Sequence, residues 1–178
     1  MRYFDKTFFK FLIGFLLIIS VSVTIVAYAR GSYIKSHESG VKTYTDPEGV
    51  FSFKYPLGSE ISGRDGALLA ELKLPRSNMP KTNFSEAKLT INWSNQPTDI
   101  NNCSGRTDTS DAGAGNFYET TVVKKIYDGD CYSFEYTIHS TNIQNYDPSQ
   151  GIKEFDKAKI KSDLESVISS FKYLVNSD

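Results

Sequence analysis

The first thirty residues constrain this chain most, because they place a long apolar run behind a basic end. The run extends from Phe11 to Ala29 and contains no charged residue. Three basic residues precede it: Arg2, Lys6 and Lys10. As a helix the run would be about 28 Å long, close to the roughly 30 Å core of a bilayer. We therefore predict that residues 11–29 form a transmembrane helix, an uncleaved signal anchor.

The same segment allows a second interpretation. Ala27-Tyr28-Ala29 fits the small-x-small pattern of a signal-peptide cleavage site, which would release a secreted protein after Ala29. The anchor is favoured because the apolar part of a signal peptide usually has only about 7–15 residues. The basic residues then place residues 1–10 in the cytoplasm and the rest of the chain outside it.

Beyond the apolar run, we predict a short linker and one folded domain. Residues 30–40 are polar and rich in Gly and Ser, as expected of a tether. Residues 41–178 are long enough for a single domain with its own core. Without its first 29 residues the chain has 17 basic and 20 acidic residues, a net charge of −3. This balance argues against nucleic acid as a partner.

The two cysteines, Cys103 and Cys131, both lie in this predicted domain. An even number of cysteines in an exported domain favours a disulfide bond between them. The alternative is that both cysteines are free, buried thiols. The spacing of the two cysteines and the two histidines matches no zinc-binding pattern, so we expect no metal site. The sequence shows no cofactor motif, so we expect no cofactor.

Alternating apolar residues predict strands over much of the domain. An Asp-Pro-Glu-Gly turn at residues 46–49 separates two runs, 42–45 and 50–56, and further alternation follows at 68–74 and 89–93. Asp128-Gly129-Asp130 predicts a hairpin between residues 116–127 and 131–139. Residues 95–116 are rich in Asn, Asp, Gly, Ser and Thr and are expected to form a long loop that contains Cys103.

One soluble helix is expected near the end of the chain. Six apolar residues recur there, from Ile160 onward at spacings of three and four: Phe155, Ile160, Leu164, Val167, Ile168 and Phe171. Residues 171–175 could continue this helix or form a closing strand. Strands first and a helix last predict an α+β class, an antiparallel sheet packed with helices.

The two ends of the domain resemble PsbP-like domains. The opening segment, Tyr44-Thr-Asp-Pro-Glu-Gly-Val-Phe-Ser-Phe-Lys-Tyr-Pro56, is similar to the start of such domains, and the helix running into Ser169-Ser-Phe-Lys-Tyr173 is similar to their last helix and strand. The resemblance implies the Mog1/PsbP fold, an α/β/α sandwich. Segments such as Asn83-Phe-Ser-Glu-Ala87 look like those of membrane-anchored, exported bacterial proteins. Neither resemblance supplies catalytic residues.

One polar cluster follows a predicted strand and is the candidate binding loop. It contains five residues with side chains suited to recognition: His139, Asn142, Asn145, Tyr146 and Asp147. A catalytic triad there is disfavoured, because His139 and Ser140 are adjacent and their side chains would point to opposite faces of a strand. Asn and Asp side chains in such loops also often bond to the backbone.

The sequence thus predicts a membrane-anchored, extracytoplasmic accessory or binding domain that is not an enzyme. Its partner would be an envelope protein or a small ligand. The alternatives are an exported or anchored hydrolase that uses the loop from His139 to Asp147, and a structural subunit of the envelope.

Overall fold

The computed structural model describes residues 40–63 and 65–174 of the 178-residue chain. The predicted anchor at residues 11–29 and most of the predicted linker lie outside these residues. No helix within the described part of the chain is long and apolar enough to cross a membrane.

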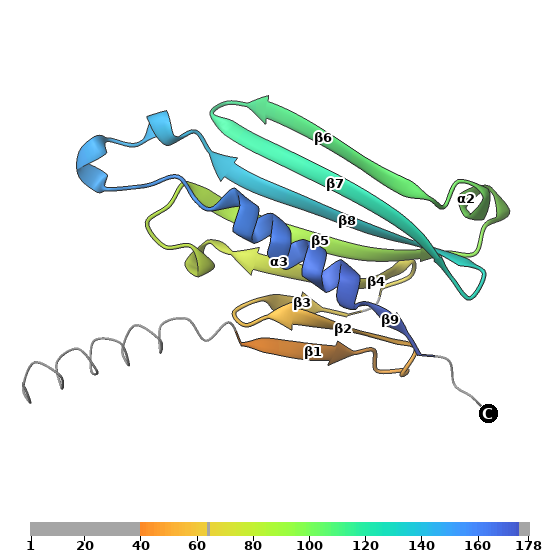
Figure 1. Ribbon diagram of the computed structural model, residues 1–178. Helices are drawn as coiled ribbons and strands as arrows, with labels where there is room; N and C mark the ends of the chain where they lie inside the picture. Colours follow the sequence, from red (N-terminus) through yellow and green to blue (C-terminus); the bar gives the residue numbers. More distant parts are fainter. Residues whose placement is uncertain (1–39, 64, 175–178) are drawn as a thin grey trace, which may run out of the picture. The chain divides into compact units, whose positions relative to one another are not determined.

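The domain consists of two antiparallel sheets and one long helix (Figure 1). The smaller sheet has the strand order β1-β2-β9 and the larger has the order β3-β4-β5-β8-β7-β6. The strands are β1 (Val41–Thr45), β2 (Phe51–Pro56), β3 (Glu60–Ser62), β4 (Leu68–Pro75), β5 (Phe84–Ser94), β6 (Gly105–Gly113), β7 (Asn116–Tyr127), β8 (Asp130–Thr141) and β9 (Lys172–Tyr173). The helices are α2 (Pro97–Asn101), α3 (Lys157–Ser170) and three short 3-10 turns, η1 (Arg76–Asn78), η2 (Ile143–Asn145) and η3 (Pro148–Gln150).

Helix α3 packs as the sequence predicts, but it begins at Lys157, so Phe155 at the start of the predicted pattern precedes it. The Asp156 side chain caps it by accepting a hydrogen bond from the Lys159 N–H at 2.9 Å. The residues that α3 buries have the predicted spacing: Ile160, Leu164, Val167 and Ile168. The helix ends at Ser170, so Phe171 and the residues after it leave the helix. Lys172 and Tyr173 then form β9, which pairs with β2. Of the two alternatives for this segment, a continued helix or a closing strand, the strand is therefore the one observed.

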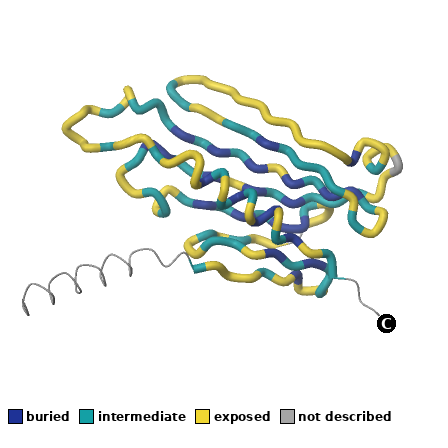
Figure 2. The backbone as a smooth tube through the Cα atoms, in the orientation of Figure 1, coloured by how far each residue is buried: buried dark blue, intermediate teal, exposed yellow. Residues whose placement is uncertain are grey.

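The larger sheet has one covered face and one uncovered face. On the face toward α3, which we call the helix face, the central strands β4, β5 and β8 place apolar side chains that are at most 3 % exposed: Leu72, Leu74, Ala87, Leu89, Ile91, Tyr132, Phe134, Tyr136 and Ile138. Figure 2 shows this burial concentrated in the centre of the sheet. The opposite face, which we call the open face, is polar. Ion pairs between neighbouring strands lie on it, Lys73–Glu86 at 2.7 Å and Lys88–Glu71 at 2.6 Å.

The α/β/α sandwich implied by the resemblance would have helices on both faces of the sheet, and the described residues differ from it. Among their helices only α3 is longer than five residues, and it lies on the helix face beside β2. Phe171 joins the layers, since its ring lies 5.5 Å from that of Phe51 in the small sheet and 5.0 Å from that of Phe134 in the large one. The polar side chains of the open face explain why no helix is needed there.

Residues 95–116 are not the long loop that their composition predicts. They contain α2, all of β6, and the tight turn into β7. Every residue of β6 is exposed, so this strand has no buried face and no alternation of apolar and polar residues. Its strand structure comes from pairing with β7, which single-sequence patterns do not reveal.

The burial pattern of β4 also differs in one detail from the strict alternation that the sequence predicts. The pairing of β4 with β5 shifts between Leu68 and Ala70. Because of this irregularity, neighbouring Leu69 and Ala70 are both buried, whereas strict alternation would have buried only every second residue.

Candidate functional site

The structure places His139 on the open face of the large sheet. Its ring stacks on that of Tyr118 at 4.5 Å, and Nε2 lies 2.9 Å from Oδ1 of Asn116. The neighbouring Ser140 is buried and lines the helix face. The two side chains thus lie on opposite faces, as the alternation of a strand requires. This arrangement gives His139 no serine nucleophile at the adjacent position.

The other four residues of the candidate loop bond to nearby groups of the loop itself, of the end of β8 or of the β6–β7 turn. The Asn142 side chain accepts from the Gln144 N–H at 3.0 Å, and Asn145 Nδ2 donates to the Gly115 carbonyl at 3.2 Å. The Tyr146 hydroxyl lies 2.7 Å from Thr141 Oγ1. Asp147 caps η3 by accepting from the Ser149 N–H at 2.7 Å, and hydrogen bonds from the Ser149 side chain and backbone lower its pKa.

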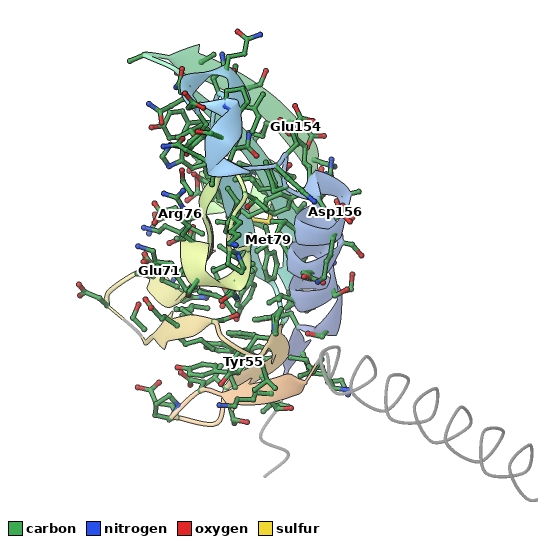
Figure 3. All side chains as sticks on the ribbon, turned by 90° about the vertical axis from the view of Figure 1, so that its left-hand side faces the viewer. Tyr55, Glu71, Arg76, Met79, Glu154 and Asp156 are labelled. Atoms are coloured by element: carbon green, nitrogen blue, oxygen red, sulfur yellow. A yellow bond between two sulfur atoms is a disulfide. The ribbon has the colours of Figure 1, made fainter. Side chains whose placement is uncertain are left out.

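A groove lies between α3 and the outer strands β6 and β7. Its larger part is a cavity of about 830 Å³, lined among others by the facing ends of β6 and β7, by residues 142–144, and by Glu154, Phe155 and Lys157 just before and at the start of α3. A cavity of about 320 Å³ adjoins it, with Ser110 and Glu119 lining both. Figure 3 views the domain from this side and labels Glu154 and Asp156, which precede α3. We call the two cavities together the α3–β7 groove.

The lining of the larger cavity is mixed in chemistry. Phe117 is an aromatic side chain that remains 41 % exposed there, and Phe155 and Ile143 add apolar surface. Asn142 and Gln144 add amides. Of the five candidate residues, Asn142 lines this cavity, while the structure puts His139, Asn145, Tyr146 and Asp147 outside the lining.

Charged side chains connect the strands to α3 across the groove. Lys157 at the start of the helix donates to Glu119 on β7. Nearer the other end of the helix, Arg106 on β6 pairs with Glu165 at 3.1 Å. The Tyr136 hydroxyl lies between them, accepting from Arg106 and donating to Glu165 at 3.2 Å each. These exposed pairs contribute little stability, so their effect is on the groove's charge pattern.

Asp108 on β6 is held in its ionised form by two neighbours. The Arg106 guanidinium donates to its carboxylate, and the Thr121 hydroxyl donates to Oδ1 at 2.5 Å. These hydrogen bonds lower the Asp108 pKa to about 2.

We expect Asp108 to titrate at about pH 2 in the folded protein, well below the ordinary value for an aspartate. Because the folded-state pKa is depressed, this group stabilises the fold above its unfolded pKa, and the contribution is lost as the pH falls toward 2. Carbon-detected NMR of the side-chain carboxyl measures the midpoint. In Arg106→Gln the midpoint should rise toward the ordinary value, and an unchanged midpoint would show that Arg106 is not the cause.

The two cysteines are brought together by the connection from β5 to β6, which passes the start of β8. The sulfur atoms of Cys103 and Cys131 lie 2.06 Å apart, at disulfide distance, and both residues are 4 % exposed. The residues that follow α2 therefore lie beside the start of β8. The pairing fastens the connection that delivers β6 to the edge of the sheet, and thus one wall of the groove.

Comparisons with known proteins give likeness of fold alone. No protein-family model and no curated protein matches the chain. A solution structure of cyanobacterial PsbP from Synechocystis is similar at 13 % identity and a TM-score of 0.38, over 76 % of this chain and 93 % of that one. The Ran-binding protein Mog1p of Saccharomyces cerevisiae is similar at 8 % identity and a TM-score of 0.41, over 79 % of this chain and 98 % of that one.

A protein of Bacteroides thetaiotaomicron matches at 12 % identity and a TM-score of 0.44, over 77 % of this chain and 50 % of that one. PsbP and Mog1 are the proteins whose fold the opening and closing segments of the sequence imply. Likeness at this level carries no argument about function, so the proposals below rest on the residues of this chain.

Sequence reasoning missed most of the groove because its residues come from segments that are far apart. Phe117, Glu119 and Lys157 carry no shared motif, and they meet only because β7 lies opposite the start of α3. One local signal does point there. Gly113-Ala-Gly115 marks the tight turn beside which residues 142–145 pack, through the Asn142 N–H to the Gly115 carbonyl at 2.8 Å.

Proposed function

We propose that this chain is a binding protein of the cell envelope, held at the outer side of the membrane by residues 11–29. Its α3–β7 groove binds an extended polypeptide segment of another envelope protein. The observation that carries the proposal is the groove itself, two adjoining cavities of about 830 and 320 Å³ along β7. An elongated, open cleft suits an extended chain better than a compact small ligand.

The chemistry of the groove supports a peptide occupant. Phe117 offers an exposed aromatic surface for an apolar side chain, and the amides of Asn142 and Gln144 can bond to peptide groups. Both charge signs are present, from Glu119 and Lys157, so neither a strongly acidic nor a strongly basic partner is favoured.

The hydrolase alternative finds less support. It needs His139 to act with a nucleophile and an acid, whereas His139 contacts Asn116 and Tyr118 on the open face. Asp147 caps η3. A base and its orienting carboxylate must be within hydrogen-bond reach of each other, and these two side chains have other partners.

A photo-crosslinking amino acid at position 117 tests the proposal in native membranes. We expect Phe117→p-benzoylphenylalanine to give one discrete product with a second protein. The matched control is the same replacement at Ile126, which is on the same strand, 52 % exposed and on the open face, and should give none.

Lys157→Glu should lower the yield at position 117 severalfold, because it places two carboxylates side by side at the start of α3. Equal products at both positions, or no product at position 117, would contradict the proposal.

A further inference from the structure

Strand β6 is an edge strand of the larger sheet. Among the described strands it is hydrogen-bonded only to β7, on one side, and all nine of its residues are exposed. Its register with β7 runs without a shift from Gly105 to Gly113, so no bulge twists it away (Figure 1). It contains neither proline nor lysine, and two of its three charged residues, Arg106 and Asp108, pair with each other at 3.0 Å. Bulges, proline and lysine are among the devices by which natural proteins blunt an edge.

The turn from β6 into β7 fixes which backbone groups point outward. Ala114 and Gly115 form a two-residue turn with φ of 50° and 76°, so Gly113 and Asn116 flank it as a hydrogen-bonded pair. Hydrogen-bonded and non-hydrogen-bonded pairs then alternate along the strands. The residues whose N–H and C=O groups face away from β7 are therefore Arg106, Asp108, Ser110 and Ala112.

Side-chain distances on the neighbouring pair of strands agree with this assignment. It makes Thr120 and Thr137 a non-hydrogen-bonded pair of β7 and β8, and Tyr118 and His139 another. Side chains of such pairs approach closely. The two threonine hydroxyls are 2.8 Å apart, and the rings of the other pair are 4.5 Å apart.

The outward edge of β6 is complementary to itself in one register. With Thr109 on a twofold axis, Arg106 lies opposite Ala112 of a second copy and Asp108 lies opposite Ser110. All four outward residues are then paired, and no two like charges face each other. If the second copy slid by two residues, so that the twofold axis passed through residue 108, the Asp108 carboxylates of the two copies would lie opposite each other. Like charges directly opposite each other destabilise a strand pair.

Charge within one copy also favours this pairing. Arg106 is neutralised in its own chain by Asp108 at 3.0 Å and by Glu165 at 3.1 Å. The outward residues therefore carry one charge of each sign, Arg106 and Asp108, which pair with each other. The Ala112 N–H donates to Asp111 Oδ1 at 2.7 Å, so the peptide groups offered to a second copy are chiefly those of Arg106, Asp108 and Ser110. Peptide groups in a row suit main-chain recognition better than charge recognition.

We propose that two copies of this chain pair through β6, antiparallel and centred on Thr109, so that their large sheets become one continuous sheet. Ser110 and Asp108, which line the grooves, lie on the same face in both copies. The pairing thus brings two α3–β7 grooves to one face of the dimer. It does not depend on what the grooves bind.

Cysteine crosslinking of the full chain in native membranes tests the register. In a non-hydrogen-bonded antiparallel pair the Cα atoms are about 4.5 Å apart, within the range that a disulfide spans. Thr109→Cys should therefore form a crosslinked dimer under mild oxidation. Thr107→Cys is the matched control, because the two copies of residue 107 are about 13 Å apart at roughly 3.3 Å per residue.

We expect Thr109→Cys to crosslink at least about tenfold faster than Thr107→Cys, whose distance no disulfide can span. Thr107→Cys co-expressed with Asp111→Cys should crosslink as a mixed pair, since this register places those residues opposite each other. Equal rates for Thr107→Cys and Thr109→Cys alone, or no dimer with Thr109→Cys, would overturn the proposal.

A proline at position 110 gives a second measurement without added thiols. The Ser110 N–H faces away from β7, so Ser110→Pro blocks pairing with a second copy without removing a bond to β7. In detergent, sedimentation equilibrium should find a dimer for the unaltered chain and for Ser110→Ala, and a monomer for Ser110→Pro. A monomer for the unaltered chain, or a dimer for a folded Ser110→Pro, would contradict the proposal.

Discussion

Phe134→Ala should lower the free energy of unfolding by about 3–5 kcal/mol, the usual cost of emptying a phenylalanine site in a core. Phe134 is fully buried at the centre of β8. Its ring meets that of Phe171 edge to face, with centroids 5.0 Å apart, at the point where the two sheets and the end of α3 come together. The Phe171 ring has little freedom to move into the space, because it also packs against Phe51 and Tyr132. Urea unfolding followed by circular dichroism measures the change.

The adjacent residue provides the control. Glu135 is on the same strand but points to the open face and is exposed. Glu135→Ala should therefore change the free energy of unfolding by no more than about 0.5 kcal/mol. If both substitutions had similar effects, the assignment of one buried and one open face to this sheet would be wrong.

Replacing both cysteines by alanine should lower the free energy of unfolding by about 3–4 kcal/mol. Cys103 and Cys131 are 28 residues apart, and closing a loop of that size restricts the unfolded chain by about this amount in the chain-entropy model. Reducing the unaltered protein should give the same loss as Cys103→Ala with Cys131→Ala.

A thiol-reactive reagent checks the bond directly. In protein isolated from its membrane without reductant, both cysteines should resist labelling even after denaturation, and both should react once reductant is added. Labelling of the denatured protein before reduction would show free thiols, the alternative that the sequence leaves open.

Strong local signals predicted most of the domain. The Asp46 to Gly49 turn indeed joins β1 and β2, with the Gly49 N–H donating to the Asp46 carbonyl at 2.8 Å. The Asp128-Gly129 turn indeed joins β7 and β8. The helix pattern through Leu164 identified the buried face of α3. Each of these features is encoded within a few residues, where turn geometry or side-chain period decides the structure.

Features that depend on a distant partner were not predictable in the same way. Strand β6 is polar on both faces, because it lies at the edge of the sheet beyond the cover of α3. Strand β3 has only three residues, Glu60 to Ser62, and is too short to show a period. In both cases a neighbouring strand supplies the order, and the segment itself carries no signal.

The candidate site shows the same division. Composition drew attention to the loop after β8, and Asn142 in that loop does line the groove. The remaining residues of the loop looked available in the sequence but are engaged with the backbone or with neighbouring side chains in the structure, as Asn145 is with Gly115. The groove itself depends on how α3 lies against β7, which no residue pattern specifies.

Our central proposal is that this domain lies outside the cytoplasmic membrane, attached by residues 11–29. A cysteine at the 52 % exposed position Ile126 tests it most directly. In intact bacterial spheroplasts, a membrane-impermeant maleimide should label Ile126→Cys at once, and should label Tyr3→Cys at the basic end only after lysis. Labelling of Ile126→Cys only after lysis would place the domain in the cytoplasm and contradict the account.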